Sequence, residues 1–201
     1  KGTPVKCNII VKDGVNTNVT LSNVSITTEK EVPLIDIGSG SNVVLNVEGT
    51  NDIINRGIRV PQGSDLKLTG EGSLHIHCEM LNSFAIGGDK ESTYGNIYIE
   101  HLPQLIIDTN GENCVGIGGG KNAADSKISI IRSGIRIECA GGNAIGIGSF
   151  DGNSNIEIHN ADLSIKMPCA NAVGIGALKG STNVIMMNYS VNVVESGNNL
   201  C

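Results

Sequence analysis

The chain has 201 residues, a formal net charge of −6 and a sequence pI near 5.1. An acidic chain without a basic cluster disfavours nucleic acid and anionic membranes as partners, and no apolar run is long enough for a membrane-spanning helix. The three tyrosines, two phenylalanines and absent tryptophan contrast with 27 glycines. This composition suits tight corners around a thin aliphatic core better than the core of a globular enzyme.

Residues 1–60 contain short apolar runs at irregular spacing. In these runs the branched aliphatic residues recur at every second position, which is the period of a strand with one buried face. The runs lie at residues 9–11, 19–21, 24–26, 34–37, 43–47, 52–54 and 57–60. We interpret them as the less regular N-terminal coils of a repeat structure.

Residues 61–195 repeat with a period of 28–31 residues. A glycine-rich phrase recurs as Ala85–Gly88, Val115–Gly118, Ile145–Gly148 and Val173–Gly176, and its isoleucine stands at positions 86, 117, 147 and 175. Two alternating runs follow each of the four phrases and keep its spacing: 96–99, 127–130, 155–158 and 183–186, then 105–108, 135–138, 163–166 and 191–194. A period of this length is typical of a solenoid.

Three short strands per repeat predict an all-β fold, a right-handed parallel β-helix of about seven coils. The handedness follows from the general preference of parallel crossovers. Because the repeat is uninterrupted, we expect residues 1–201 to form a single domain.

The repeated glycines are the first candidate functional feature. If the central isoleucine of each phrase points inward, strand alternation sends the flanking glycines outward. One reading is that they serve only tight corners or positive φ; the other is that a ligand chain, a partner surface or a folded-back loop approaches the rod there. The predicted close-approach surface consists of Gly116, Gly118, Gly146, Gly148, Gly174 and Gly176.

Polar loops border this surface and stack in register, and solenoids commonly bind ligands on such a one-sided row of loops. A smooth floor with polar walls suits an extended polysaccharide, with Tyr94 or Phe150 as a stacking platform. The candidate ligand-binding residues are Asp89, Glu91, Tyr94, Lys121, Asn122, Asp125, Phe150, Asp151, Asn153 and Lys179. Ordinary solvated loops are the alternative.

The phrase Ala85–Gly88 followed by Gly95–Ile99 resembles bacterial secreted and cell-surface parallel β-helix proteins of the wider pectate-lyase-like group. The resemblance covers about residues 80–195. It implies an extracellular module that contacts carbohydrate or acts in adhesion. The chain has no recognisable cluster of calcium-binding aspartates with a catalytic Arg or Lys, so the resemblance does not carry enzymatic activity over.

One set of outward charged residues is a candidate for catalysis. His77, Asp108, Glu138 and Lys166 occupy equivalent positions in successive coils, and Asp108 and Glu138 would lie roughly 5 Å apart, as carboxyl groups do in retaining glycosidases. Arg136 and Lys166 are placed to neutralise this pair, which favours an exposed charge ladder.

Two groups of side chains are candidates for binding a metal ion. His75 and His77 share an outward face, but the sequence shows no third ligand for a transition metal, so we expect solvated side chains and no metal site. Calcium is possible at Asp89, Glu91, Asp125 and Asp151, whose oxygens are the ligands it prefers.

The six cysteines contain no C-x-x-C pair, which disfavours zinc-finger and redox motifs. Two pairs across neighbouring coils, Cys139 with Cys169 and Cys78 with Cys114, are candidates for a disulfide; buried thiols acting as apolar fillers are the alternative.

We therefore expect a non-enzymatic, extracellular carbohydrate-binding or adhesion module of a bacterial surface protein, with a polysaccharide or host glycan as partner. A structural stalk that packs on a neighbouring domain or another copy is the first alternative. A polysaccharide lyase or glycoside hydrolase is the second.

Overall fold

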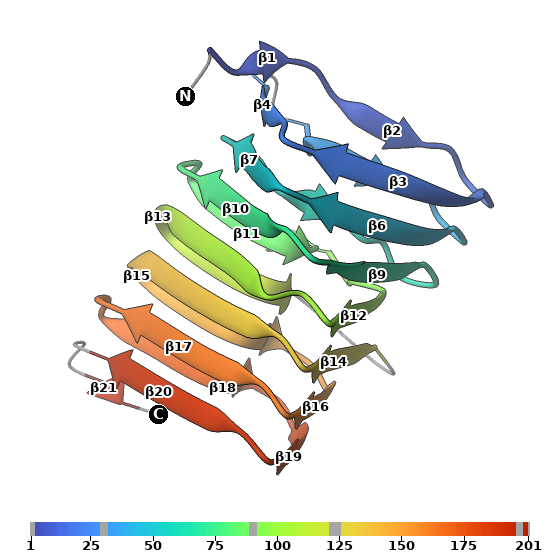
Figure 1. The fold of residues 1–201 in the computed structure, drawn as a ribbon. Coiled ribbons are helices and arrows are strands. Elements are labelled where there is room, and N and C mark those ends of the chain that lie inside the picture. The colour runs from blue at the N-terminus through green and yellow to red at the C-terminus, as the bar shows by residue number, and fades with distance from the viewer. Residues whose placement is uncertain (1–2, 29–31, 89–91, 121–125, 196–198, 201) are drawn as a thin grey trace.

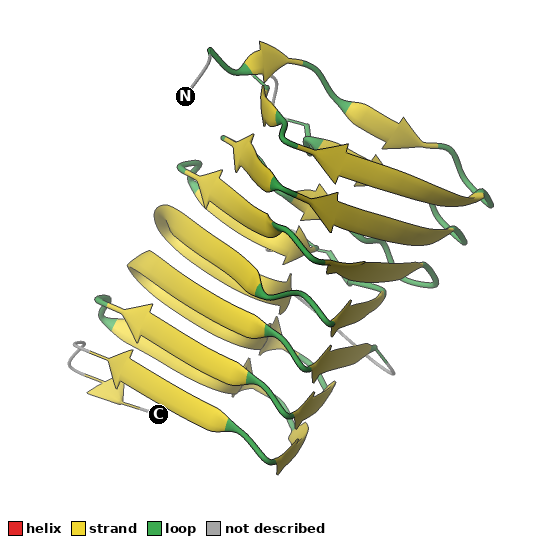
Figure 2. Cartoon of the chain, in the orientation of Figure 1, coloured by secondary structure: helices red, strands yellow, loops and turns green. Residues whose placement is uncertain are grey.

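A computed structural model describes residues 3–28, 32–88, 92–120, 126–195 and 199–200. All regular elements in these ranges are strands, joined by short turns (Figure 2). The described residues include no helix able to span a bilayer. The predicted all-β class is confirmed.

The strands stack as a right-handed parallel β-helix with three faces (Figure 1). The first face contains β1 (Val5–Lys6), β4 (Ser25–Thr27), β7 (Thr50–Ile54), β10 (Ser73–Cys78), the first halves of β13 (Gln104–Gly119) and β15 (Gly134–Asp151), β17 (Asp162–Met167) and β20 (Ser190–Glu195). The second face contains β2 (Ile9–Val11), β5 (Ile35–Ile37), β8 (Ile58–Arg59), β11 (Asn82–Gly87), the second halves of β13 and β15, β18 (Asn171–Lys179) and β21 (Asn199–Leu200).

The third face is a separate seven-stranded sheet with one strand from each coil. Its strands are β3 (Asn16–Ser22), β6 (Asn42–Glu48), β9 (Asp65–Gly70), β12 (Asn96–Glu100), β14 (Lys127–Ile131), β16 (Ser154–His159) and β19 (Thr182–Met187). The predicted architecture of about seven coils with three strands each is thus confirmed, including the irregular coils before residue 61.

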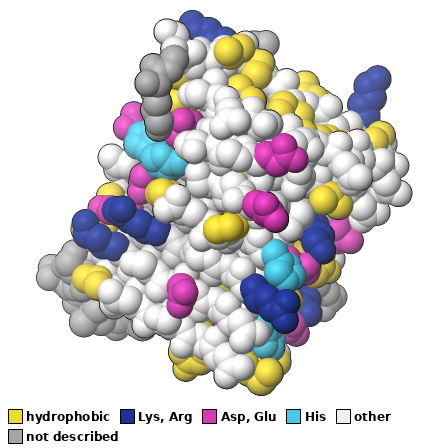
Figure 3. Space-filling view, viewed as in Figure 1, with side chains coloured by type: hydrophobic (Ala, Val, Ile, Leu, Met, Phe, Trp, Pro, Cys, Tyr) yellow, Lys and Arg dark blue, Asp and Glu magenta, His cyan; other side chains and the backbone are white. Residues whose placement is uncertain are grey.

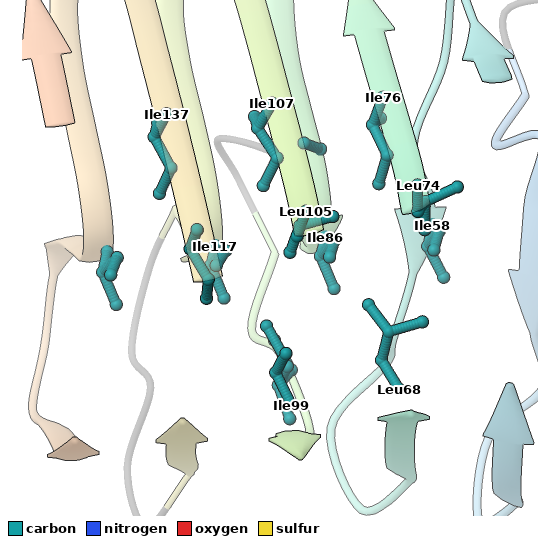
Figure 4. Packing of buried hydrophobic residues seen from close by; sticks show 14 of the residues in the cluster. Ile58, Leu68, Leu74, Ile76, Ile86, Ile99, Leu105, Ile107, Ile117 and Ile137 are labelled. Atoms are coloured by element: carbon teal, nitrogen blue, oxygen red, sulfur yellow. The ribbon is translucent and has the colours of Figure 1, made fainter. Parts of the chain in front are cut away.

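The isoleucines of the glycine phrase form one column through the core. Ile86 pairs in register with Ile117, Ile117 with Ile147, and Ile147 with Ile175. The column continues upward through Ile58, Ile35 and Ile9, which the sequence repeat did not reveal. Figure 4 shows Ile58, Ile86 and Ile117 in line. Stacking of like side chains at one strand spacing, about 4.8 Å, explains why a thin core suffices.

Inward residues of the first face build two parallel columns. Leu74, Leu105, Ile135 and Leu163 form one, and Ile76, Ile107, Ile137 and Ile165 form the other. All eight are buried. Complete burial of each such side chain contributes about 1.5–3 kcal/mol, so the alternating pattern of the sequence is also the main source of stability.

The corner between the first and second faces carries an asparagine ladder. Asn113 Nδ2 donates to Asn82 Oδ1 (2.9 Å), Asn143 Nδ2 to Asn113 Oδ1 (3.0 Å), and Asn171 Nδ2 to Asn143 Oδ1 (2.9 Å). Each amide therefore joins its coil to the preceding one. These bonds satisfy polar groups at a corner where the backbone turns away from its sheet.

The corner between the third and first faces turns on a single left-handed residue. Positive φ angles between 49° and 56° occur there at Asn23, His101, Arg132, Asn160 and Asn188. Asparagine tolerates this conformation better than most side chains. The turn is short, so the strands on either side stay in register from coil to coil.

Candidate functional site

The six glycines predicted to form an open surface are buried. A Cβ on Gly116 would lie 2.9 Å from Ile137 Cγ2, so this position faces the core. A Cβ on Gly118, where φ is +132°, would lie 1.8 Å from the carbonyl oxygen of Gly148. The close approach therefore comes from the next coil of the same chain.

The prediction of an outward glycine row was wrong because the strand does not alternate through the phrase. Ala85 and Ile86 are consecutive, yet both lie in the core cluster. Gly116, Gly146 and Gly174 occupy the position of Ala85 in later coils. This break in the two-residue period sends them inward, and only the corner reading, for the positive-φ glycines Gly118, Gly148 and Gly176, agrees with the backbone.

Apolar side chains cover the outside of the second face. Phe84, Val115, Ile145 and Val173 form a second cluster that is separate from the main core. Phe150, near the end of β15, and Leu178, near the end of β18, pack against it and are partly buried. Phe150 is therefore engaged by its own chain and does not stand free as the stacking platform expected from the sequence.

Tyr94 is also not a surface platform, because its side chain is fully buried. Its hydroxyl donates to Ser154 Oγ at 3.0 Å, and burial raises the pKa of the phenol. A Cβ on Gly119 would lie 2.5 Å from Tyr94 Cδ1, so this glycine provides the room for the ring. The prediction of a ligand-contacting Tyr94 was wrong.

The remaining loop candidates divide into two groups. Asp89, Glu91, Lys121, Asn122 and Asp125 lie outside the described residues.

Asp151, Asn153 and Lys179 are exposed at the edge of the second face. Asp151 pairs in register with Lys179, and Asn153 Oδ1 accepts from the Ser181 amide at 3.3 Å. Of the proposed calcium ligands, the described residues include Asp151 alone.

The outer side of the first face carries the charge ladder. The register pairs His77 with Asp108, Asp108 with Glu138, and Glu138 with Lys166, as expected from the sequence. A neighbouring column contains Ser25, Asp52, His75, Ile106, Arg136, Ser164 and Asn192. On β10, β13, β15 and β17 the two columns place donors and acceptors side by side, except at the apolar Ile106.

Glu138 is held by two cations. Lys166 Nζ donates to its Oε1 at 2.9 Å, and Arg136 Nη2 lies 3.5 Å from its Oε2. The Lys166 hydrogen bond is the main reason why the pKa of Glu138 is lowered. Asp108, its neighbour in the ladder, instead meets a histidine. The two carboxylates that resemble a glycosidase pair thus have different partners, and both lie on a half-exposed strand face.

A histidine cluster occupies the N-terminal half of the ladder. His75 Nε2 lies 2.7 Å from Asp108 Oδ2, and His75 Nδ1 lies 3.6 Å from Asp52 Oδ1. His77 Nε2 lies 2.8 Å from Glu79 Oε1. Figure 3 shows histidine side chains (cyan) beside Asp and Glu side chains (magenta), with Lys and Arg (dark blue) below them on the left of the viewed face.

A pocket of about 320 Å³ opens beside this cluster. Its lining includes Pro4, Ser25, Asp52, His75 and His77. It therefore lies between the N-terminal strand and the outer side of β7 and β10. Among the described residues, His75, His77 and Asp108 are the one group of three possible metal ligands whose ligand atoms all lie within 4.8 Å of one another.

Asp52, Glu79 and the convergence on Asp108 were missed by the sequence interpretation. The signal for Asp108 was present, since the repeat already placed it opposite His77. Asp52 lies opposite His75, but the irregular length of the coils before residue 61 hid that register. Glu79 follows the end of β10, where no strand pattern indicates which way a side chain points.

Four of the five described cysteines are buried. Cys78 and Cys139 share a column with Thr109 between them. Burial raises the pKa of both to about 12. The thiols therefore act as small apolar fillers of the corner, and no disulfide occurs among the described residues.

Comparison with protein-family models, with curated proteins and with solved structures finds no match to this chain.

Proposed function

We propose that the chain is a non-catalytic binding module for an extended polysaccharide, and that the ligand lies along the outer side of the first face. The observation that carries the proposal is the double column of polar side chains described above. It offers donors and acceptors of both charge signs at one strand spacing over the four strands β10, β13, β15 and β17. An extended chain of similar units can repeat its contacts against such a surface, as ligands of other solenoids do.

The resemblance of the glycine repeat to bacterial surface β-helix proteins supports an extracellular, adhesive setting for this activity. The loop edge at Asp151, Asn153 and Lys179 borders the opposite side of the rod. This edge would serve as a secondary contact, because the neighbouring ring of Phe150 already packs against Val115, Ile145 and Val173.

A non-catalytic role is supported by the partners of the charged groups. A general acid needs a raised pKa at the working pH, whereas the pKa of Glu138 is lowered by Lys166. The lowered pKa of Glu138 therefore disfavours hydrolysis by the Asp108 and Glu138 pair.

Binding to a glycan array, repeated with chelator, tests the proposal. The variant Arg136→Ala/Lys166→Ala removes two donors from the ladder and is expected to abolish binding. Lys127→Ala is the matched control, because Lys127 forms an ion pair with Glu157 at 2.7 Å on the outer side of the third face. Loss in Phe150→Ala with retention in the double variant would move the site to the loop edge, and an array without any ligand would contradict the proposal.

A structural stalk is the second candidate. It is favoured by the apolar side chains exposed on β19 and β20: Val184, Ile185, Met187, Val193 and Val194. Exposed apolar residues in one area commonly mark a contact with another protein surface. Concentration-dependent association in sedimentation velocity, reduced by Ile185→Lys/Met187→Lys, would support this role.

A further inference from the structure

We propose that His75, His77 and Asp108 form a binding site for a divalent transition metal ion, with Zn²⁺ as the preferred occupant. The proposal stands on the geometry of the histidine cluster and does not depend on carbohydrate binding.

The strand geometry brings the three ligands together. His75 and His77 are two residues apart on β10, so both side chains project from the outer side of the first face. Their ring centroids lie 6.1 Å apart with an interplanar angle of 71°. Asp108 is opposite His77 on the neighbouring strand β13 and reaches diagonally to His75. The ligands are thus fixed by a parallel sheet and not by a loop.

The donor set matches the metal. Two imidazole nitrogens and one carboxylate oxygen, with a water in the fourth position, form a common tetrahedral zinc site. Ligand bonds of about 2.0–2.2 Å place two such atoms roughly 3.4 Å apart across a tetrahedral ion. The His75 and Asp108 atoms, now 2.7 Å apart, would separate by a small side-chain rotation. Both side chains are about one-third exposed, so this rotation is not blocked by core packing.

The surroundings also fit a cation. Asp52 Oδ1 lies 3.6 Å from His75 Nδ1, on the side of the ring away from Asp108. A carboxylate in this place orients a ligating histidine and increases its basicity. Its side chain is only 11% exposed, so its position is well defined. With Glu79 beside His77, three carboxylates surround two imidazoles that must be neutral to bind metal.

The open coordination position would face the pocket lined by Ser25, Asp52, His75 and His77. An ion there would be accessible to water and to a small oxygen ligand.

Isothermal titration with ZnCl₂ tests the proposal on the full chain. Cys7 is exposed, and thiolates bind zinc, so the reference protein carries Cys7→Ser and Cys201→Ser. We expect one ion per chain and a rise in Tm on binding. Titration with Co²⁺ is expected to produce the intense visible absorption of a tetrahedral nitrogen and oxygen site.

Single substitutions test which residues bind the metal ion. His75→Gln, His77→Gln and Asp108→Asn are each expected to weaken Zn²⁺ binding by about 100-fold or more, and Asp52→Asn by about 10- to 100-fold. His159→Gln, on the outer side of the third face, is the matched control and keeps the affinity of the reference protein. Circular dichroism of each variant verifies that the fold is intact. Absence of Zn²⁺ binding, or binding that survives His75→Gln and His77→Gln, overturns the proposal.

Discussion

Single residues at the corners hold neighbouring coils together in this chain. The asparagine ladder supplies side-chain hydrogen bonds from coil to coil, and the positive-φ glycines let two backbones meet where a side chain has no space. Both kinds of residue are small and polar or bare, so neither adds apolar surface. At places where the chain turns, the asparagines satisfy polar groups with hydrogen bonds, and the glycines leave room for the backbone of the next coil.

Gly148→Ala tests the second kind. The residue has φ +137°, and an added Cβ would lie 1.7 Å from the carbonyl oxygen of Gly176. We expect the free energy of unfolding to fall by more than about 3 kcal/mol, measured by urea denaturation. Gly142→Ala is the control, since its nearest atom, the Glu112 oxygen, is 3.0 Å away; a change there within about 1 kcal/mol is expected. Equal effects of the two variants would contradict the interpretation.

Asn143→Ala tests the ladder. The substitution removes one hydrogen bond donated to Asn113 and one accepted from Asn171. At about 0.5–1.5 kcal/mol for each bond, we expect a loss of about 1–3 kcal/mol in unfolding free energy. Asn155→Ala, at an exposed position of β16, is expected to change stability by about 0.5 kcal/mol or less. A neutral Asn143→Ala would show that water replaces the ladder without cost.

At the scale of strands, position within a column determines the environment of a side chain. Inward positions stack like with like, whereas outward positions on the first face stack charged groups that are compensated by neighbours in the same or the adjacent column. Glu138 illustrates the second case, because its cations come both from its own strand (Arg136) and from the next one (Lys166).

The pH dependence of stability tests this electrostatic arrangement. The folded state lowers the pKa of Glu138 below the reference value of 4.5, so the carboxylate contributes stability at pH values above 4.5. That contribution disappears as the pH falls through the lower, folded-state pKa. We expect Glu138→Gln to be less stable than wild type by under about 1 kcal/mol at pH 7, with the difference decreasing as the pH is lowered below 4.5. A difference that does not change as the pH is lowered would point to packing as its cause.

Most strands could be predicted from the sequence because a buried face in a strand requires alternation, and alternation is visible in the residues. The prediction failed where the period of two fails. Ala85 and Ile86 both face the core, so the direction of every glycine after Val115, Ile145 and Val173 was misassigned. Tyr94 was misassigned for a related reason, since its burial depends on space left by Gly119 in another coil.

The candidate site shows the same limit. The ladder from His77 to Lys166 could be predicted, because equal spacing in regular coils fixes the register. The contacts of His75 with Asp108 and Asp52 could not, because they run diagonally or reach into a coil of different length. Side-chain direction at such positions follows from the local twist of the sheet, which the sequence pattern does not contain.

At the scale of the whole molecule, each coil contacts mainly the coils before and after it. The last complete strand of the third face shows the effect on burial. Val184 occupies the same inward column as Ile156, yet it is 38% exposed and Ile156 only 1%. Stability in such a stack is approximately a sum of coil and neighbour terms, so it is not uniform along the rod.

Hydrogen exchange followed by mass spectrometry is expected to show this gradient. Amides of β13 and β15 lie between paired strands on both sides and should exchange slowest. Amides of β19 and β20 should exchange first, through local opening that does not require global unfolding. Uniform protection along the chain would mean that the rod unfolds as one cooperative unit.

The ladder register also makes this rod modular. Asn113 and Asn143 are equivalent positions separated by 30 residues, so excision of residues 113–142 removes one whole coil and leaves ends that already match. In the shortened chain Asn82 would meet Asn143, and Asp108 would meet Lys166 directly. Excision of half that length would set Ile86 against a corner. The molecule can therefore gain or lose length only in whole coils, and natural variants of this fold should differ in length by whole coils.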